Sequence, residues 1–487
     1  MSKATSITVN KIILPIRIRN AEIKNSIRKL ILDTYQFRNL LIMLIKRYYK
    51  LYNKSLLNPS VLYGLISMKY SGKYKKEFDK AMENIQKDEK LKEILNALNK
   101  QKEVIGNTNV MHNMIRQVVQ DFTNYFSALK VYNKNPQKFT SMPKPPKTKK
   151  LKELINSSIT ITGSIIKRDN DNMLVNLRNK EKLSIKLPKD FSYKITSARL
   201  KVFASDVYAD IVYDKPEQIM QPKGDYIAGI NLGVDELISV VSNNPIIRSF
   251  IVSGKEIKAY IQWSNKHKSL IQSQIDHLKK QVANTNNKEE LQILKQQLKD
   301  LEMQLKLLSA HRKRRIDTDF HKITKRLVDI LYETGHKTIY VARVSGQQYI
   351  SIPFERLVAL LKYKAQRYGM EVIEVDRKYT TRTSPFADII KIQKEDNLSL
   401  CNGEKEKNIF KDYTVNKIMH ADLVGALNIM RVGSKTLKFD FYDNTKLFFI
   451  KLCNPIRFKL VDFIYKAKPE LLYVNTISKK VLETEKQ

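Results

Sequence analysis

The stretch Tyr226–Asp235, YIAGINLGVD, is followed by a second apolar run at Ile238–Val241. An apolar run, a single polar residue, a glycine and a second run rich in β-branched residues together predict two adjacent strands joined by a tight turn. The polar residue inside the first run is Asn231. We expect this hairpin to begin the sheet on which the C-terminal half of the chain is built.

A hairpin of this kind is typical of the first two strands of an RNase H-type sheet, which presents its first acidic metal ligand at the position of Asn231. Phosphodiester hydrolysis by this fold uses two divalent metals held by carboxylates, because the metals stabilise both the attacking and the leaving oxygens. An amide offers Mg²⁺ one neutral oxygen and no negative charge. The sequence therefore predicts a nuclease fold without its first acid.

The charge of the chain indicates a polyanionic partner. Its 487 residues include 88 Lys and Arg against 49 Asp and Glu, which gives a formal net charge of +39. Such an excess repels itself unless a polyanion neutralises it, so nucleic acid is the expected partner. Because the excess extends from end to end, a long RNA or a duplex is favoured over a small anion. A chain of this length is expected to form roughly two to four domains.

The cysteine content and the hydropathy predict a cytoplasmic, nucleoid-associated protein with no membrane partner. Cys401 and Cys453 are the only two cysteines, which favours a reducing compartment without a disulfide framework. The N-terminal residues lack the apolar segment of a secretion signal, and no apolar run reaches the length of a membrane span.

The N-terminal half changes its periodicity three times. A β-rich segment at 7–18 precedes helical periodicity, a cationic proline-rich segment follows, and a period of two then dominates from Ser158 to Tyr213. We expect residues 1–19 and 151–220 to form a β-barrel domain, residues 20–135 an inserted helical lobe, and residues 136–150 an extended basic connector.

The C-terminal half predicts a mixed α/β domain over residues 221–432. Heptad spacing on both sides of the turn Asn284–Asn287 predicts an antiparallel helical hairpin at 262–310. The basic run His311–Arg315 is expected at the start of the next helix, as a grip for phosphates. Residues 433–487 form a C-terminal extension for which the sequence predicts no structure.

Clustered cations are the candidate contacts with nucleic acid, because several of them lie near aromatic or proline-rich segments. These candidates are Lys46, Arg47, Lys144, Lys147, Lys149, Lys150, Arg312, Lys313, Arg314, Arg315, Lys322, Lys325 and Arg382.

Six motifs in register over residues 225–432 resemble the transposon-encoded TnpB family and the similar compact type V CRISPR effectors. They are GINLGVD, LSAHRKRRIDTDFHKITKRLV, YVARVSG, SIPFERLVALLKYKAQRYG, YTTRTSPF and HADLVGALNIMRVG. The resemblance implies an α/β multidomain protein with a β-barrel wedge domain, a helical recognition lobe and a RuvC domain of RNase H fold. It also implies a guide RNA and a double-stranded DNA target, with base pairing supplying the sequence specificity.

The family's catalytic acids are largely missing from the matching positions. Asn231 replaces the first aspartate, Ala342 and Arg343 stand where the family has its glutamate, and Asp422 retains the last aspartate. Asp376 is a candidate displaced acid, since some relatives carry the middle acid near this position. We therefore expect no active catalytic residue and only weak binding of Mg²⁺; without metal-binding partners, Asp422 is interpreted as a helix N-cap.

The resemblance also implies a zinc ribbon in many relatives, between the YTTRTSPF and HADLVGALNIMRVG motifs. Only Cys401 lies in this interval, whereas a closed structural zinc site requires four ligands. No zinc is expected.

These expectations favour a nuclease-inactive, RNA-guided DNA-binding protein, similar to the nuclease-dead TnpB-like regulators of the TldR type. Occupancy of a target would regulate transcription, with repression preferred over recruitment of RNA polymerase or a sigma factor. Two alternatives stay open: an RNA-guided endonuclease with a rearranged RuvC site, and an RNA-free accessory protein of a transposase.

Overall fold

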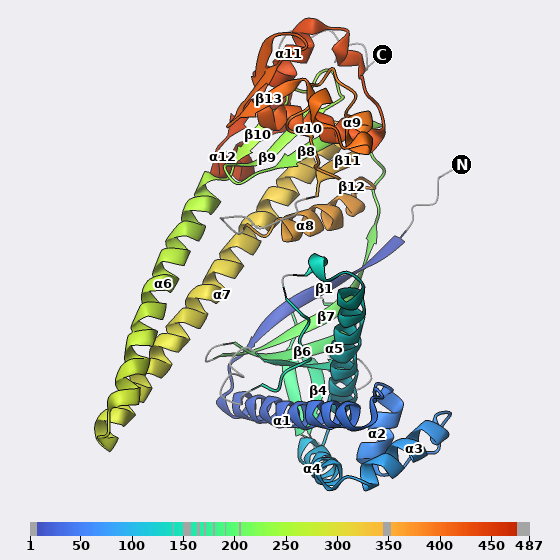
Figure 1. Cartoon of the computed structure of the whole chain (residues 1–487), viewed down its shortest axis with the longest axis vertical. Helices are drawn as coiled ribbons and strands as arrows, with labels where there is room; N and C mark the ends of the chain where they lie inside the picture. Colours follow the sequence, from blue (N-terminus) through green and yellow to red (C-terminus); the bar gives the residue numbers. More distant parts are fainter. Residues whose placement is uncertain are drawn as a thin grey trace. The chain divides into compact units, whose positions relative to one another are not determined.

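The computed structural model describes residues 7–139, 141–149, 157–162, 166–169, 172–178, 181–189, 191–203, 206–343 and 352–474. The chain divides into two compact units (Figure 1). One comprises Val9–Pro216, and the other contains the residues from Glu217 onward.

Four of the five described helices of the N-terminal unit begin at side-chain caps, and α3 does not. Asn20, Asn58, Asp88 and Asn107 each accept a hydrogen bond from a backbone N–H in the first turn of the helix that follows, which satisfies donors that have no partner within the helix. The helices are α1 (Ala21–Tyr52), α2 (Pro59–Ser67), α3 (Lys75–Gln86), α4 (Glu89–Ile105) and α5 (Thr108–Lys134).

The described strands of the N-terminal unit form two sheets. A four-stranded sheet has the order β1-β7-β6-β2, and a three-stranded sheet has the order β3-β4-β5. Within the described ranges no strand pairing joins the two sheets into a closed ring, so the expected barrel is not seen there. The strands are β1 (Ile7–Ile18), β2 (Ser158–Thr162), β3 (Ile166–Asp169), β4 (Asn172–Arg178), β5 (Glu181–Lys186), β6 (Lys194–Phe203) and β7 (Asp206–Gln218).

The second unit is built on a six-stranded sheet with the order β12-β11-β8-β9-β10-β16. Strands β8, β9 and β10 form an antiparallel meander, while β11 pairs parallel to β8 and β12 pairs parallel to β11. This order and these directions are those of an RNase H-like sheet, so the predicted α/β fold class is confirmed. The strands are β8 (Tyr226–Leu232), β9 (Glu236–Ser242), β10 (Phe250–Ser253), β11 (His336–Ala342), β12 (Glu371–Val375) and β16 (Ile456–Phe458).

Apolar clusters cover both faces of this sheet. Helix α10 (Ala421–Ser434) contributes to one cluster, and α7 (Lys288–Glu333), α8 (Phe354–Arg367) and α12 (Leu460–Lys466) contribute to the other. Gly229 permits the close approach of α10, because a Cβ atom at this position would collide with the carbonyl oxygen of Ala426. The absence of a side chain in the middle of β8 thus brings α10 onto the sheet.

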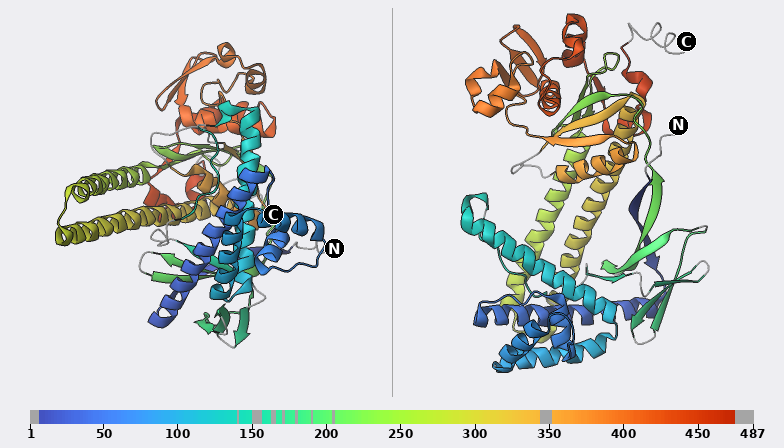
Figure 2. Two further views of the ribbon diagram at one scale, coloured as in Figure 1. Left: turned by 60° about the horizontal axis from the view of Figure 1, so that its bottom comes forward. Right: turned by 90° about the vertical axis from the view of Figure 1, so that its right-hand side faces the viewer.

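Helix α6 (Lys255–Asn284) and α7 form a long antiparallel hairpin (Figure 2), with its turn within the predicted segment Asn284–Asn287. The hairpin is longer than the predicted range 262–310, because α7 continues without a break for 46 residues. The expectation that His311–Arg315 begins a helix was wrong. This run lies in the middle of α7, since it contains neither a proline nor a glycine to end the preceding turn.

The C-terminal tail is part of the second unit rather than a separate extension. Strand β16 pairs parallel to β10 at the edge of the sheet, and α11 (Thr445–Cys453) lies between α10 and β16 in the chain. Lys451 of α11 is fully buried, and its Nζ donates hydrogen bonds to the carbonyl oxygens of Ser242, Asn244 and Ile247 at 3.0, 2.8 and 2.6 Å. Within the described part of the chain, every helix is too short or too polar to cross a membrane.

Candidate functional site

The candidate site lies at the C-terminal ends of three adjacent parallel strands. Val341 of β11 is paired with Ile230 of β8, and Ala342 is paired with Val375 of β12. Asn231 and Ala342 are the next residues on these two neighbouring strands, so they lie side by side. Both are buried. In open α/β sheets, ligands bind at this edge, so the two replaced acid positions occupy the place where an RNase H-like site is expected.

Helix α10 brings Asp422 to the same edge. The Nδ2 of Asn231 donates a hydrogen bond to Oδ1 of Asp422 over 3.1 Å, although the two residues are 191 positions apart in the chain. The Oδ1 of Asn231 is buried without a hydrogen-bond partner among the described residues. Asp422 lies inside the first turn of α10 and His420 occupies the N-cap position, so the interpretation of Asp422 as an N-cap was wrong.

One cation of the chain contacts Asp422, and a second interacts with it electrostatically. Lys405 of β13 (Gly403–Glu406) places its Nζ 3.2 Å from Oδ1 of Asp422. Burial lowers the pKa of the Arg377 guanidinium, and the charge of Asp422 opposes this effect, which places Arg377 within electrostatic reach of the same carboxylate. The carboxylate of Asp422 is therefore paired with an ammonium group of the chain itself.

The structure also gathers two residues that the sequence analysis did not select. Ligand atoms of Glu236, His420 and Asp422 all lie within 4.8 Å of one another. The Oε1 of Glu236 accepts a hydrogen bond from Nη1 of Arg457 at 2.6 Å. Its Oε2 lies 3.2 Å from Nε2 of His420, but among the described residues neither this oxygen nor the ring nitrogens of His420 have a hydrogen-bond partner.

The donor set does not fit the two Mg²⁺ ions that the fold family implies. A pair of hard dications needs several carboxylate oxygens with uncompensated charge. Here Asp422 contacts Lys405 and interacts electrostatically with Arg377, and Glu236 contacts Arg457. A bound dication would have to displace these cations or be repelled by them.

The lowered pKa of Glu236 predicts that the free energy of unfolding depends on pH. Burial raises the pKa of its carboxyl group, but the interactions with His420 and Arg457 outweigh burial and lower the pKa from 4.5 to about 2. A lowered folded-state pKa stabilises the protein above pH 4.5, and this contribution is lost as the pH falls toward 2. We expect Glu236→Gln to lower the free energy of unfolding by about 2 kcal/mol at pH 7, and by progressively less below pH 4.5. Urea unfolding of both proteins from pH 7 to pH 3 measures this; a difference that stays constant over the whole range would contradict it.

The candidate displaced acid is not brought into the cluster. Asp376 is exposed, and its Oδ1 accepts a hydrogen bond from the backbone N–H of Lys378 at 3.0 Å. Glu374 pairs with Lys362 at 2.6 Å and with the exposed Arg343 at 3.8 Å. In this segment the side chain near Asp422 is thus the cation Arg377 rather than an acid.

The segment between Thr383 and His420 is held together by a small sheet and by buried hydrogen bonds. A three-stranded antiparallel sheet, β13-β14-β15, is formed by Gly403–Glu406, Ile409–Asp412 and Lys417–His420. The buried Oγ of Ser384 donates a hydrogen bond to Oδ2 of Asp412 at 2.7 Å, and Phe410 is fully buried. Cys401 is buried and accepts a hydrogen bond from the hydroxyl of Thr383 at 3.5 Å. This sheet positions Lys405 next to Asp422.

The predicted nucleic-acid contacts differ in their surroundings. Arg47 forms two hydrogen bonds with the carboxylate of Asp88, at 2.7 and 2.6 Å, and Lys325 pairs with Asp329 at 2.6 Å, so both are engaged within the chain. Exposed cations include Lys144, Lys147, Lys149, Lys313, Arg314, Arg315 and Arg382. Lys150 lies outside the described residues.

The sequence analysis did not select Lys405 or Arg377, because neither residue type nor spacing distinguishes them from surface cations. Lys405 belongs to the alternating run Glu404–Lys407, which is typical of a solvated strand, and Arg377 follows the acid that drew attention. His420, two positions before Asp422, was the one available signal, since histidine and aspartate close together are common in metal sites.

The strand order, the position of α10 and this pocket define an RNase H-like domain whose site gathers Asp422, Glu236, His420, Asn231 and Lys405. Residues 354–429 match the sequence family described as Cas12f1-like, TNB domain. TnpB-like protein ORF457 of Acidianus two-tailed virus is 27% identical over 226 residues, which cover 45% of this chain and 44% of that protein. The match thus spans less than half of the viral relative. Over these residues the chain is therefore similar to Cas12f1-like and TnpB-like proteins.

The solved structures that match this chain are more distant in sequence. A cryo-EM structure of a Cas12f1–sgRNA–target DNA complex is 13% identical, with a TM-score of 0.49, over 85% of this chain and 83% of the Cas12f1 chain. A CRISPR-Cas12f ternary complex is also 13% identical, with a TM-score of 0.31, over 85% and 82% of the two chains. The RNase H-like assignment rests on the strand order rather than on these likenesses.

Proposed function

We propose that the protein is a nuclease-inactive, RNA-guided DNA-binding protein that acts by occupying its target. The observation that carries the proposal is the contact of Asp422 with both Asn231 and Lys405. An ammonium and an amide on the one retained acid supply the local charge balance that a divalent metal supplies in an active site. Under this proposal, the contacts of Asp422 with Asn231 and Lys405 serve the stability of the domain rather than metal binding.

The remainder of the chain retains the features required for binding. Its formal charge of +39 favours release of counterions from a long polyanion. The similar Cas12f1 structure was determined with a guide RNA and target DNA, which supports the same two partners here. We further propose that residues 20–135 act as the recognition lobe, that residues 1–19 and 151–220 act as the wedge domain, and that residues 136–150 connect them.

Repression of transcription is the preferred outcome of occupancy, because a bound complex blocks polymerase without a further interface. Recruitment of RNA polymerase or a sigma factor would need an additional binding surface.

The proposal predicts binding without cleavage. The purified ribonucleoprotein, carrying its copurified RNA, is incubated with a matched DNA duplex and Mg²⁺ or Mn²⁺. We expect a gel shift at nanomolar protein and intact DNA on a denaturing gel, because removing members of a catalytic unit costs several orders of magnitude in rate. In cells, a reporter with a matched target in its promoter should lose expression.

Each rival gives a different result in these assays. Cut DNA whose appearance is abolished by Asp422→Asn would establish an endonuclease with a rearranged site. A protein that purifies without RNA would favour an accessory role at a transposase. Increased reporter expression would replace repression with recruitment.

A further inference from the structure

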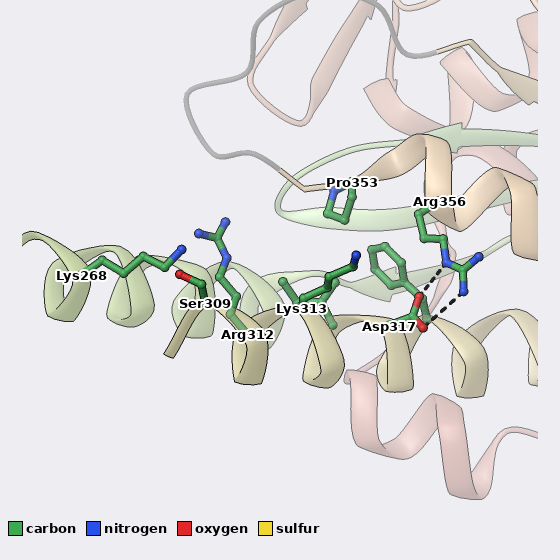
Figure 3. Close-up of a pocket in the computed structure, with 9 residues that line it drawn as sticks. Lys268, Ser309, Arg312, Lys313, Asp317, Pro353 and Arg356 are labelled. Atoms are coloured by element: carbon green, nitrogen blue, oxygen red, sulfur yellow. Dashed lines mark hydrogen bonds and ion pairs between the residues drawn. The ribbon is translucent and has the colours of Figure 1, made fainter. Parts of the chain in front are cut away.

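A cavity of about 410 Å³ lies between the hairpin α6–α7 and the start of α8 (Figure 3). Its lining does not include Asp422, and it contains Arg312 and Lys313 from the predicted phosphate-binding run His311–Arg315. Its lining residues are Lys268, Ser309, Arg312, Lys313, Ile316, Asp317, Phe320, Pro353 and Arg356.

The two ends of the cavity differ in their ion pairs. Arg356 has a carboxylate partner, whereas Lys268 and Arg312 have none among the described residues. On the α8 side, Arg356 binds both oxygens of Asp317, with Nε–Oδ1 at 2.6 Å and Nη2–Oδ2 at 3.2 Å. On the other side, Lys268 reaches from α6 toward Arg312 of α7, as Figure 3 shows. Arg312 donates a hydrogen bond to the neutral amide of Asn265 at 2.7 Å, and within the described residues no ion pair joins Lys268 or Arg312 to an acid.

Lys268 and Arg312 therefore hold like charges close together. Burial and the neighbouring charge of Arg312 both lower the pKa of Lys268. Two cations held in this way are stabilised by an anion between them, and a phosphate group is the anion that arginine and lysine bind best together.

The cavity is larger than a phosphate requires and has an apolar side. Ile316, Phe320 and Pro353 line it beside the cations. Its volume falls within the range of about 300–1,000 Å³ that is typical of sites for small organic ligands. A ligand that satisfies both sides carries a phosphate at one end and a flat apolar group at the other.

We propose that this pocket binds one unstacked nucleotide of the bound nucleic acid, with its phosphate against Lys268 and Arg312 and its base against Ile316 and Pro353. The proposal rests on the nucleic-acid binding proposed above and adds a specific site to it. Unstacked bases occur in RNA loops and in displaced single strands, so the nucleotide can come from the guide RNA or from the DNA target.

Two variants test separately whether the positive charge of the pocket and its free volume are needed for binding. Lys268→Gln with Arg312→Gln removes the phosphate contacts, and Ser309→Trp fills the cavity without changing the charge. The matched control is Lys280→Gln with Lys299→Gln, which removes one exposed cation from each of the same two helices outside the cavity.

Affinity of the full-length protein for its copurified RNA, and of the ribonucleoprotein for a matched duplex, is measured at several salt concentrations. We expect both pocket variants to weaken one of these two affinities about ten-fold, as for loss of one base contact, and the control to weaken it less than about two-fold. Ultraviolet cross-linking and mass spectrometry on the wild type should give a peptide of α7 joined to a single nucleotide. A ribonucleotide identifies the guide, and a deoxynucleotide identifies the target.

The proposal is overturned if Ser309→Trp leaves both affinities unchanged, or if the pocket and control pairs weaken binding equally, since the cations would then act only through general charge. Failure of the wild type to bind RNA or DNA at all would instead refute the proposed function, so the two failures are distinguishable.

Discussion

Restoring the missing acids and removing the internal cation should create a divalent-metal site. In the variant with Asn231→Asp, Ala342→Glu and Lys405→Ala, each change makes the pocket more negative by one unit. Asn231 and Ala342 lie at the ends of adjacent strands and Asp422 faces them, so three carboxylates would converge there. We expect binding of Mn²⁺ to tighten on the order of 100-fold, and Mg²⁺-dependent cleavage of a matched target to appear.

The control for this experiment keeps Lys405 and removes a neighbouring cation. Lys411 lies on β14 of the same small sheet, is exposed, and pairs with Glu406 at 3.2 Å. A variant with Asn231→Asp, Ala342→Glu and Lys411→Ala has the same net charge, yet we expect it to bind Mn²⁺ weakly. Equal binding by the two variants would show that Lys405 is not what excludes the metal. Calorimetric titration measures binding, and thermal unfolding with and without Mn²⁺ checks that each variant is folded.

Lys451→Met should destabilise the protein strongly. Burial lowers the pKa of the Lys451 ammonium group to about 7, while three carbonyl oxygens accept its hydrogen bonds. Methionine preserves most of the volume but removes three hydrogen bonds to buried carbonyl oxygens; of these oxygens, only that of Asn244 has a further partner among the described residues, the backbone N–H of Ile247 at 3.3 Å. We expect the free energy of unfolding to fall by about 3–5 kcal/mol, because each unsatisfied buried group costs about 1–3 kcal/mol and the costs partly overlap.

Lys446→Met is the matched control, since Lys446 is exposed on the same helix α11. We expect this substitution to change stability by less than about 0.5 kcal/mol. Urea unfolding followed by circular dichroism compares the two variants. A loss below about 1 kcal/mol for Lys451→Met would mean that water replaces the ammonium group, and that the tail is held mainly by its apolar contacts.

The C-terminal tail illustrates why part of the fold escaped prediction. Its short segments carry apolar and basic residues by turns, and three residues of β16 are too few to show a period of two. What makes β16 a strand is the exposed edge of β10, which offers it hydrogen-bonding partners that no local pattern encodes. The central hairpin was predictable for the opposite reason: β8 and β9 are long, apolar and joined by a recognisable turn.

The sequence by itself predicted the strands of the central sheet and the strongly positive charge, because periodicity, residue type and net charge are properties of the chain. Only the tertiary structure determines which side chains contact Asp422. Lys405 and Asn231 reach it from two different strands, at 3.2 and 3.1 Å, and these contacts act through space rather than along the sequence. The same reason applies to the cavity between α6 and α7, where Lys268 and Arg312 face each other across 44 positions of the chain.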